Sequence, residues 1–191
     1  MKRAILAFTI ATIAILGSGT AALAAPAASQ TISFTGYANF NSILGGNLNG
    51  PATVSGDIND GNLGDLRADV NFPLRDMSLT ISPVDVLPLT TQELGVQWNR
   101  VTCDPFYGCS YTYGFSTFNY QRVQGPVTIK AGSLHGTGSF SAQTNATCVS
   151  SCPPAGSWWS APSGYSNLNG ALTSSKEAGF LNINGGAPDI R

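Results

Sequence analysis

The amino-acid sequence predicts an all-β fold, a single antiparallel β-barrel of about eight to ten strands, with a β-sandwich as the alternative. Apolar residues mostly recur at every second position, which is the period of a strand with one buried face. Turn-forming residues separate these stretches at short intervals, and no stretch has the period of an amphipathic helix. The predicted inward faces mix large residues with glycine and alanine, which suits the tapering interior of a small closed barrel.

The first expected strand, 31–40, shows the alternation clearly. Ile32, Phe34, Ala38 and Phe40 share one face, and threonine, serine, tyrosine and asparagine occupy the other. The same pattern predicts about ten strands, at 31–40, 52–58, 66–72, 77–81, 94–98, 111–120, 127–131, 134–142, 168–172 and 180–183.

Turn signals divide these strands. The stretch 59–62, Asn-Asp-Gly-Asn, has the residues of a tight hairpin turn, and 45–47, 125–126 and 174–176 are further predicted breaks. The stretches 83–93 and 144–166 are predicted to be loops. The segment DINDGNLGD at 57–65 also offers oxygen ligands for calcium, but its Asp60 and Gly61 come one residue early for an EF-hand loop. The hairpin turn accounts for the same residues, so no metal site is predicted.

Residues 1–24 have the three parts of a secretory signal peptide. Lys2 and Arg3 precede an uncharged apolar run at 4–16, and Ala22-Leu23-Ala24 is a cleavage signal. The apolar run is short for a retained membrane anchor, which needs about 20 residues. We therefore expect the mature chain to be one all-β domain, 25–191, exported to the periplasm or the extracellular space of a bacterium and without a membrane span.

The charge balance excludes a nucleic-acid-binding protein. Removing Lys2 and Arg3 from the nine basic residues leaves seven, against ten acidic residues, and lysine and arginine form no cluster. A basic surface patch, which nucleic acids and acidic membrane surfaces require, is therefore not expected.

The four cysteines are expected to form disulfides, because an exported chain meets an oxidising compartment. The favoured pairs are Cys103–Cys109 and Cys148–Cys152, each of which closes a small loop. A crossed pairing and a four-cysteine zinc site are the alternatives. The five residues between Cys103 and Cys109 are a wider spacing than zinc sites usually have.

Seven aromatic residues lie within CDPFYGCSYTYGFSTFNY, residues 103–120. Tyr111, Tyr113 and Phe115 share one strand face, and Phe118 and Tyr120 share the other, so either a bulge near 116–117 or a strand buried on both faces is expected. The favoured interpretation is a long central strand that leaves a disulfide-closed hairpin and fills the core with its rings. The alternative is that some of the rings line a pocket or a rim.

The predicted loop CPPAGSWWSAPSGY, 152–165, contains two adjacent tryptophans. Trp158 and Trp159 are expected either to cap an open end of the barrel or plug the loop, or to offer rings to a sugar, a flat apolar ligand or a protein. The binding candidates are therefore Trp158, Trp159, Phe106, Tyr107, Tyr111 and Tyr113.

No catalytic constellation is predicted, and neither a cofactor nor enzymatic activity is expected. His135 is the one histidine of the chain and lies on the polar face of its strand, with no evident serine and carboxylate partners. The ten acidic residues offer carboxylate pairs, but nothing in the sequence selects the pair that a glycosidase needs.

Three stretches resemble the β-barrel of transferrin-binding-protein-type surface proteins and their small secreted relatives. They are LRADVNFPLRDMSLTIS at 66–82, LHGTGSFSA at 134–142 and LNGALTSSKEAGFLNI at 168–183. The resemblance implies an eight-stranded barrel whose loops bind a protein or haem partner. The chain departs from that pattern because it lacks the lipid-bearing cysteine, adds two cysteine loops and lacks the closing Phe-Gly-Pro.

The sequence thus predicts an exported, non-enzymatic β-barrel that acts through its loops by binding an unidentified partner, either a protein or a small apolar ligand. One alternative is a lipocalin-like carrier of a small apolar ligand inside the barrel. The other is a small outer-membrane barrel, which requires lipid-facing apolar strands and aromatic girdles.

Overall fold

A computed structural model describes residues 29–43, 46–73 and 75–191. The expected signal peptide, 1–24, lies outside the described residues. Within them the chain is almost entirely β-strand, and no helix long and apolar enough to cross a membrane occurs there. The all-β prediction is therefore confirmed.

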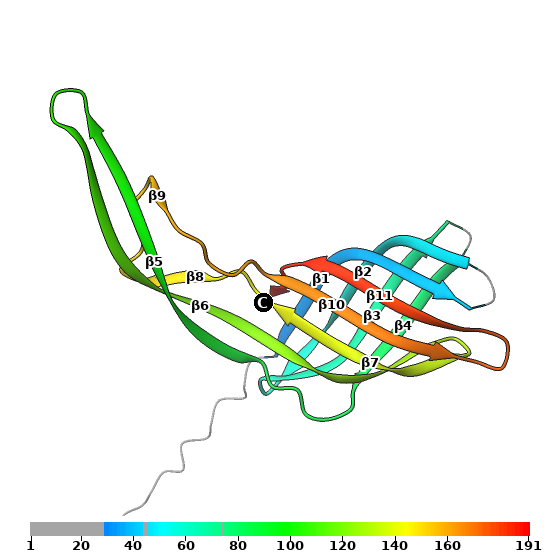
Figure 1. Ribbon diagram of the computed structural model, residues 1–191. Helices are drawn as coiled ribbons and strands as arrows, with labels where there is room; N and C mark the ends of the chain where they lie inside the picture. Colours follow the sequence, from blue (N-terminus) through cyan, green and yellow to red (C-terminus); the bar gives the residue numbers. More distant parts are fainter. Residues whose placement is uncertain (1–28, 44–45, 74) are drawn as a thin grey trace, which may run out of the picture.

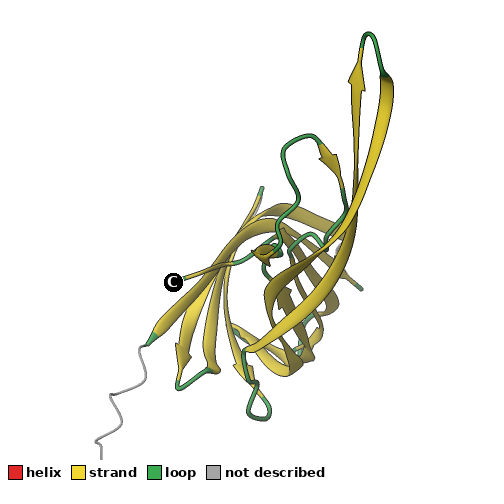
Figure 2. Ribbon diagram, turned by 90° about the vertical axis from the view of Figure 1, so that its left-hand side faces the viewer, coloured by secondary structure: helices red, strands yellow, loops and turns green. Residues whose placement is uncertain are grey.

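Twelve strands form one antiparallel sheet. Their bounds are β1 Gln30–Ser42, β2 Gly46–Asn59, β3 Asn62–Phe72, β4 Arg75–Pro83, β5 Thr90–Asp104, β6 Gly108–Ala131, β7 Leu134–Gln143, β8 Thr147–Ser150, β9 Ser157–Trp158, β10 Tyr165–Thr173, β11 Ala178–Gly186 and β12 Asp189–Ile190. Eight of them follow one another in the order β4-β3-β2-β1-β11-β10-β7-β6, and β6 pairs with β4 to close the ring. This ring is the predicted barrel (Figures 1 and 2).

The barrel interior is filled by side chains from alternate positions of the ring strands. Ile32, Phe34, Ala38 and Phe40 of β1 are all buried, as the alternation predicts. The Phe34 ring stacks on that of Phe140 across the interior, with ring centroids 6.2 Å apart. Buried side chains from all eight ring strands continue this core.

The outer surface of the barrel is polar. Strands β10 and β11 present an asparagine ring there, formed by Asn167, Asn169, Asn182 and Asn184. The amide of Asn167 donates to Asn184, Asn184 to Asn182, Asn182 to Asn169, and Asn169 back to Asn167. Each side-chain NH₂ group thus donates to the side-chain oxygen of the next asparagine, and the hydrogen bonds close into a circle.

One predicted break is wrong. Gly125-Pro126 was expected to end a strand, but β6 runs through both residues and joins the expected strands 111–120 and 127–131. A Cβ at position 125 would lie 2.1 Å from the side chain of Leu87, so the glycine makes room for a core residue. Pro126 lies one residue beyond Val127, where the paired register with β4 ends, and its carbonyl oxygen accepts a hydrogen bond from the Val84 backbone N–H. A proline is tolerated at such a strand position because no N–H is needed to continue the ladder.

The long strand β6 leaves the barrel. Its 24 residues extend roughly 80 Å at about 3.3 Å per residue, far more than the ring uses. Residues 122–131 pair with β7, whereas residues 108–122 pair with β5. We call β5 together with residues 108–121 of β6 the arm; it projects well beyond the barrel (Figure 1).

A second segment folds onto the arm. Residues 144–164, here called the wrap, were predicted to be a loop but contain two short strands. β8 pairs with β6, with Cys148 opposite Phe118, and β9 pairs with β5, with Trp158 opposite Asn99. The expected bulge in the strand 111–120 is absent, because β6 pairs with β5 in an unbroken register from Gly108 to Arg122. The β6–β8 pairing does shift register between Thr117 and Phe118, but the extra residue there is Val149 of β8.

Both favoured disulfides, Cys103–Cys109 and Cys148–Cys152, are present. The first closes the tip of the arm, and the second closes a loop within the wrap. The crossed pairing and the zinc site are thereby excluded. Disulfides persist in oxidising compartments, so they indicate an exported environment.

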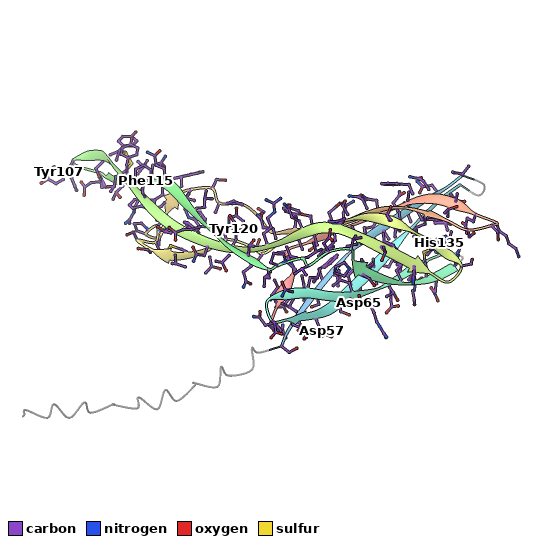
Figure 3. The ribbon with its side chains drawn as sticks, turned by 90° about the horizontal axis from the view of Figure 1, so that it is seen from below. Asp57, Asp65, Tyr107, Phe115, Tyr120 and His135 are labelled. Carbon is purple, nitrogen blue, oxygen red and sulfur yellow. A yellow bond between two sulfur atoms is a disulfide. The ribbon has the colours of Figure 1, made fainter. Side chains whose placement is uncertain are left out.

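The stretch 59–62 is the hairpin turn that the sequence predicts. Asp60 and Gly61 both have positive φ angles, 52° and 74°, as a two-residue type I′ turn requires. Across residues 29–43, 46–73 and 75–191, no three His, Cys, Asp or Glu side chains are grouped so that they could hold a metal ion. Asp57 and Asp65 lie at the barrel, away from the arm (Figure 3).

Candidate interaction surface

The first half of β6 has an inverted pattern of exposure. Tyr111, Tyr113 and Phe115 are 64%, 64% and 72% exposed, whereas Ser116, which points to the opposite side, is 2% exposed. The prediction that these rings fill the core is therefore wrong. The alternation of rings with small residues is real, but the segment lies outside the barrel. The wrap covers the opposite side at Ser116 and Phe118, whereas Ser110 and Thr112 nearer the tip are exposed.

Strand pairing gathers further side chains on the exposed side. Directly opposite residues of antiparallel strands point to the same side of the sheet. Val101 lies opposite Tyr111, Asn99 opposite Tyr113, and Gln97 opposite Phe115. Asn99 also lies opposite Trp158 of β9, which is 74% exposed. We call Val101, Tyr111, Tyr113, Phe115 and Trp158 the aromatic face.

The covered side is packed by the wrap. The Phe118 ring is buried and lies against the Trp159 ring, with centroids 4.8 Å apart. The Ser116 hydroxyl donates a hydrogen bond to the carbonyl oxygen of Ser151. A Cβ at position 114 would lie 2.3 Å from the ring of Trp98, so Gly114 allows that ring to lie flat on β6. This packing fixes which side of the arm faces outward.

The two adjacent tryptophans therefore have different positions. Trp158 belongs to the aromatic face, and Trp159 packs on the covered side against Phe118. Neither tryptophan caps the barrel, so that part of the expectation is wrong.

The tip of the arm adds two more exposed rings. Phe106 and Tyr107 are 90% and 92% exposed, and Tyr107 marks the far end of the molecule (Figure 3). The Asp104 carboxylate accepts hydrogen bonds from the backbone N–H groups of Phe106, at 2.8 Å, and Tyr107, at 3.0 Å. Together with the Cys103–Cys109 disulfide, these bonds hold the two rings in a defined turn.

The aromatic face carries no charge. Gln97 and Asn99 are its polar members, and Arg100 points to the opposite side together with Thr112. The nearest charged side chain on the same side of β5 is Glu93, four residues from Gln97 toward the barrel. The face therefore offers ring surfaces and amide groups, which suits an uncharged apolar partner.

His135 is far from this surface. It is exposed on β7 at the end of the barrel opposite the arm tip (Figure 3), and its Nδ1 lies 3.4 Å from the Ser133 carbonyl oxygen. Its position on the polar face is as expected. The structure does not bring it together with any of the six binding candidates.

Sequence reasoning missed Phe115 and Val101 as members of the surface. Phe115 continues the spacing of Tyr111 and Tyr113, so the alternation itself could have found it. Val101 joins them only through the register of β5 with β6, which the sequence does not reveal.

The chain matches no protein-family model, no curated protein and no solved structure. The resemblance to transferrin-binding-protein-type barrels stays a prediction, and the function is argued from the surface itself.

Proposed function

We propose that this protein is an exported, non-enzymatic β-barrel that binds a protein partner through the aromatic face and the tip of its arm. The observation that carries the proposal is the inverted exposure of β6, with rings outward and Ser116 buried. Folded monomers rarely expose apolar patches larger than a few hundred Å². Aromatic rings that are held outward by packing on their other side are typical of interfaces, where tyrosine and tryptophan dominate the binding energy.

The exposed ring area has the size of a protein interface. Six rings, Phe106, Tyr107, Tyr111, Tyr113, Phe115 and Trp158, are between 64% and 92% exposed. At about 200 Å² for each aromatic side chain they offer roughly 900 Å². A standard protein–protein interface covers about 800 Å² on each partner. A small ligand would cover only a part of this surface.

The barrel itself favours a surface function over a carrier function. Its interior holds Phe40, Phe72, Phe140 and many aliphatic side chains that are almost completely buried. The hollow between Thr53, Asp69 and Ser78 lies on the outside of the barrel wall. A lipocalin-like carrier instead needs interior room for its ligand.

The outer face of the ring also argues against an outer-membrane barrel. Outward positions carry serine, threonine, asparagine and aspartate, as in Thr35, Asn39, Asp69 and Ser139. A membrane barrel presents an apolar band to lipid at these positions. The proposed location is the periplasm or the extracellular space of a bacterium, reached through the signal peptide at 1–24.

Photo-crosslinking in the producing cell tests the proposal. p-Benzoylphenylalanine replaces Tyr113 of the aromatic face in one variant and Tyr37, an exposed ring of the barrel wall, in the matched control. We expect a protein adduct from position 113 and none from position 37. The absence of any protein adduct from position 113, with the folded chain present, would overturn the proposed function.

A further inference from the structure

The aromatic face leaves a surface of neighbouring rings uncovered. Its four rings, Tyr111, Tyr113, Phe115 and Trp158, leave roughly 550 Å² uncovered at about 200 Å² per ring. A patch of this size is at the upper end of what folded monomers expose, and such patches are often functional. A second copy of the same chain is available to cover it, because it is made and exported together with the first.

The charge distribution permits self-association. A two-fold contact brings each group near its own counterpart, so any charge at the centre of such a face meets a like charge. The side chains of the aromatic face and its polar members, Gln97 and Asn99, are uncharged. The barrel wall differs, because it presents Asp57, Asp65, Arg67 and Asp69 within a few residues of one another.

The shape of the arm also permits a face-to-face contact. The arm stands clear of the barrel in both ribbon views (Figures 1 and 2), so two arms can overlap while their barrels lie at opposite ends. Two sheets pack about 10 Å apart with interdigitating side chains. An antiparallel overlay centred on Tyr113 places Tyr113 against Tyr113 of the second copy and Tyr111 against its Phe115.

From these observations we infer that the partner of the aromatic face is a second copy of this chain, in a two-fold dimer whose arms pack ring against ring around Tyr113. The inference rests on the proposed function and names its partner. With the arm tips included, each copy contributes roughly 900 Å², which reaches the roughly 800 Å² per partner of a stable interface.

Sedimentation velocity of the chain 25–191 tests the dimer from about 1 to about 100 µM, the range of weak to moderate interfaces. We expect a dimer of the wild type and of the control Tyr37→Asp. Tyr113→Asp and Tyr113→Lys place like charges on the two-fold axis, and each should weaken the dimer by about 100-fold or more. Because Tyr113 is largely exposed, both variants should keep the wild-type melting temperature when all three proteins are measured at a concentration low enough for each to be monomeric.

A mixture of the two charge variants gives the decisive readout. Equal amounts of Tyr113→Asp and Tyr113→Lys should form a heterodimer, because the opposed charges then attract, whereas each variant alone is monomeric. Variants that fail to fold would not show this rescue, so misfolding cannot imitate the result.

Several outcomes overturn the inference. A wild-type chain that remains monomeric at about 100 µM excludes a dimer with a dissociation constant in the tested range. If the Tyr113 crosslink then yields an adduct of a different protein, the proposed function stands and only the identity of the partner is wrong. The chain could instead remain monomeric and float with phosphatidylethanolamine–phosphatidylglycerol vesicles. If Tyr113→Asp abolishes that flotation, the rings bind lipid and the inferred dimer is wrong.

Discussion

The two adjacent tryptophans of the wrap should have separable effects on stability and on association. Trp159 stacks on the buried ring of Phe118, whereas Trp158 points outward on the aromatic face. Trp159→Ala should therefore lower the free energy of unfolding. Trp158→Ala should mainly weaken the binding of the partner.

The expected difference follows from the buried areas. Trp159 is 48% exposed and Trp158 is 74% exposed. With about 250 Å² for a tryptophan side chain, they bury about 130 and 65 Å². At about 25 cal/mol per Å², these areas correspond to about 3 and 1.5 kcal/mol. The ring pair with Phe118 adds about 0.5–1.5 kcal/mol to the first value, so the two variants should differ by about 2–3 kcal/mol.

Urea unfolding followed by far-UV circular dichroism measures this difference, since that signal does not depend on tryptophan fluorescence. Measurements at low protein concentration keep self-association from contributing to the apparent stability. Equal losses of stability in the two variants, or a larger loss in Trp158→Ala, would refute the assignment of Trp159 to the covered side. Phe118→Ala combined with Trp159→Ala completes a double-mutant cycle for the ring pair.

Three further changes test other parts of the fold. Gly136→Ala should cost about 3 kcal/mol in urea unfolding, because its Cβ would lie 1.8 Å from the carbonyl oxygen of Ala171; Gly95→Ala, which meets no atom within 4 Å, should leave stability unchanged. Removing the arm-tip disulfide Cys103–Cys109 should speed hydrogen exchange in the tip, because the residues around this disulfide are exposed. The midpoint of the barrel's urea unfolding should stay unaltered. Glu177→Gln removes a 2.8 Å ion pair with Arg75 at the surface, and a change in unfolding free energy above about 1 kcal/mol would contradict its assignment as a surface pair.

Most of the barrel could be predicted from local patterns. The alternation in 31–40 and the Asn-Asp-Gly-Asn turn at 59–62 both depend on short stretches, and both predictions are confirmed. The lengths of the strands were harder to predict than their existence. The expected strand 94–98 is the centre of β5, which continues to the arm tip through polar residues without a core-facing pattern.

At the candidate surface, alternation alone does not decide which side of a strand is buried. A strand with rings on one face and small residues on the other normally buries its rings. In β6 the rings are outside because of a segment distant in sequence: the wrap pairs with both strands of the arm and packs Trp159 onto Phe118 on the other side. The sequence distance between the arm and the wrap explains why local reasoning identified Tyr111 and Tyr113 as important but expected them inside.

The asparagine ring has a consequence for the chemical ageing of this protein. Asn169 and Asn184 each precede a glycine, the dipeptide at which asparagine deamidates fastest through a cyclic imide. Imide closure needs a free side-chain amide and a pliable backbone. Here each amide is engaged in the ring, and both dipeptides lie in strands that are paired on both sides. The folded barrel thus shields these two labile sites, and deamidation at either of them requires β10 and β11 to separate.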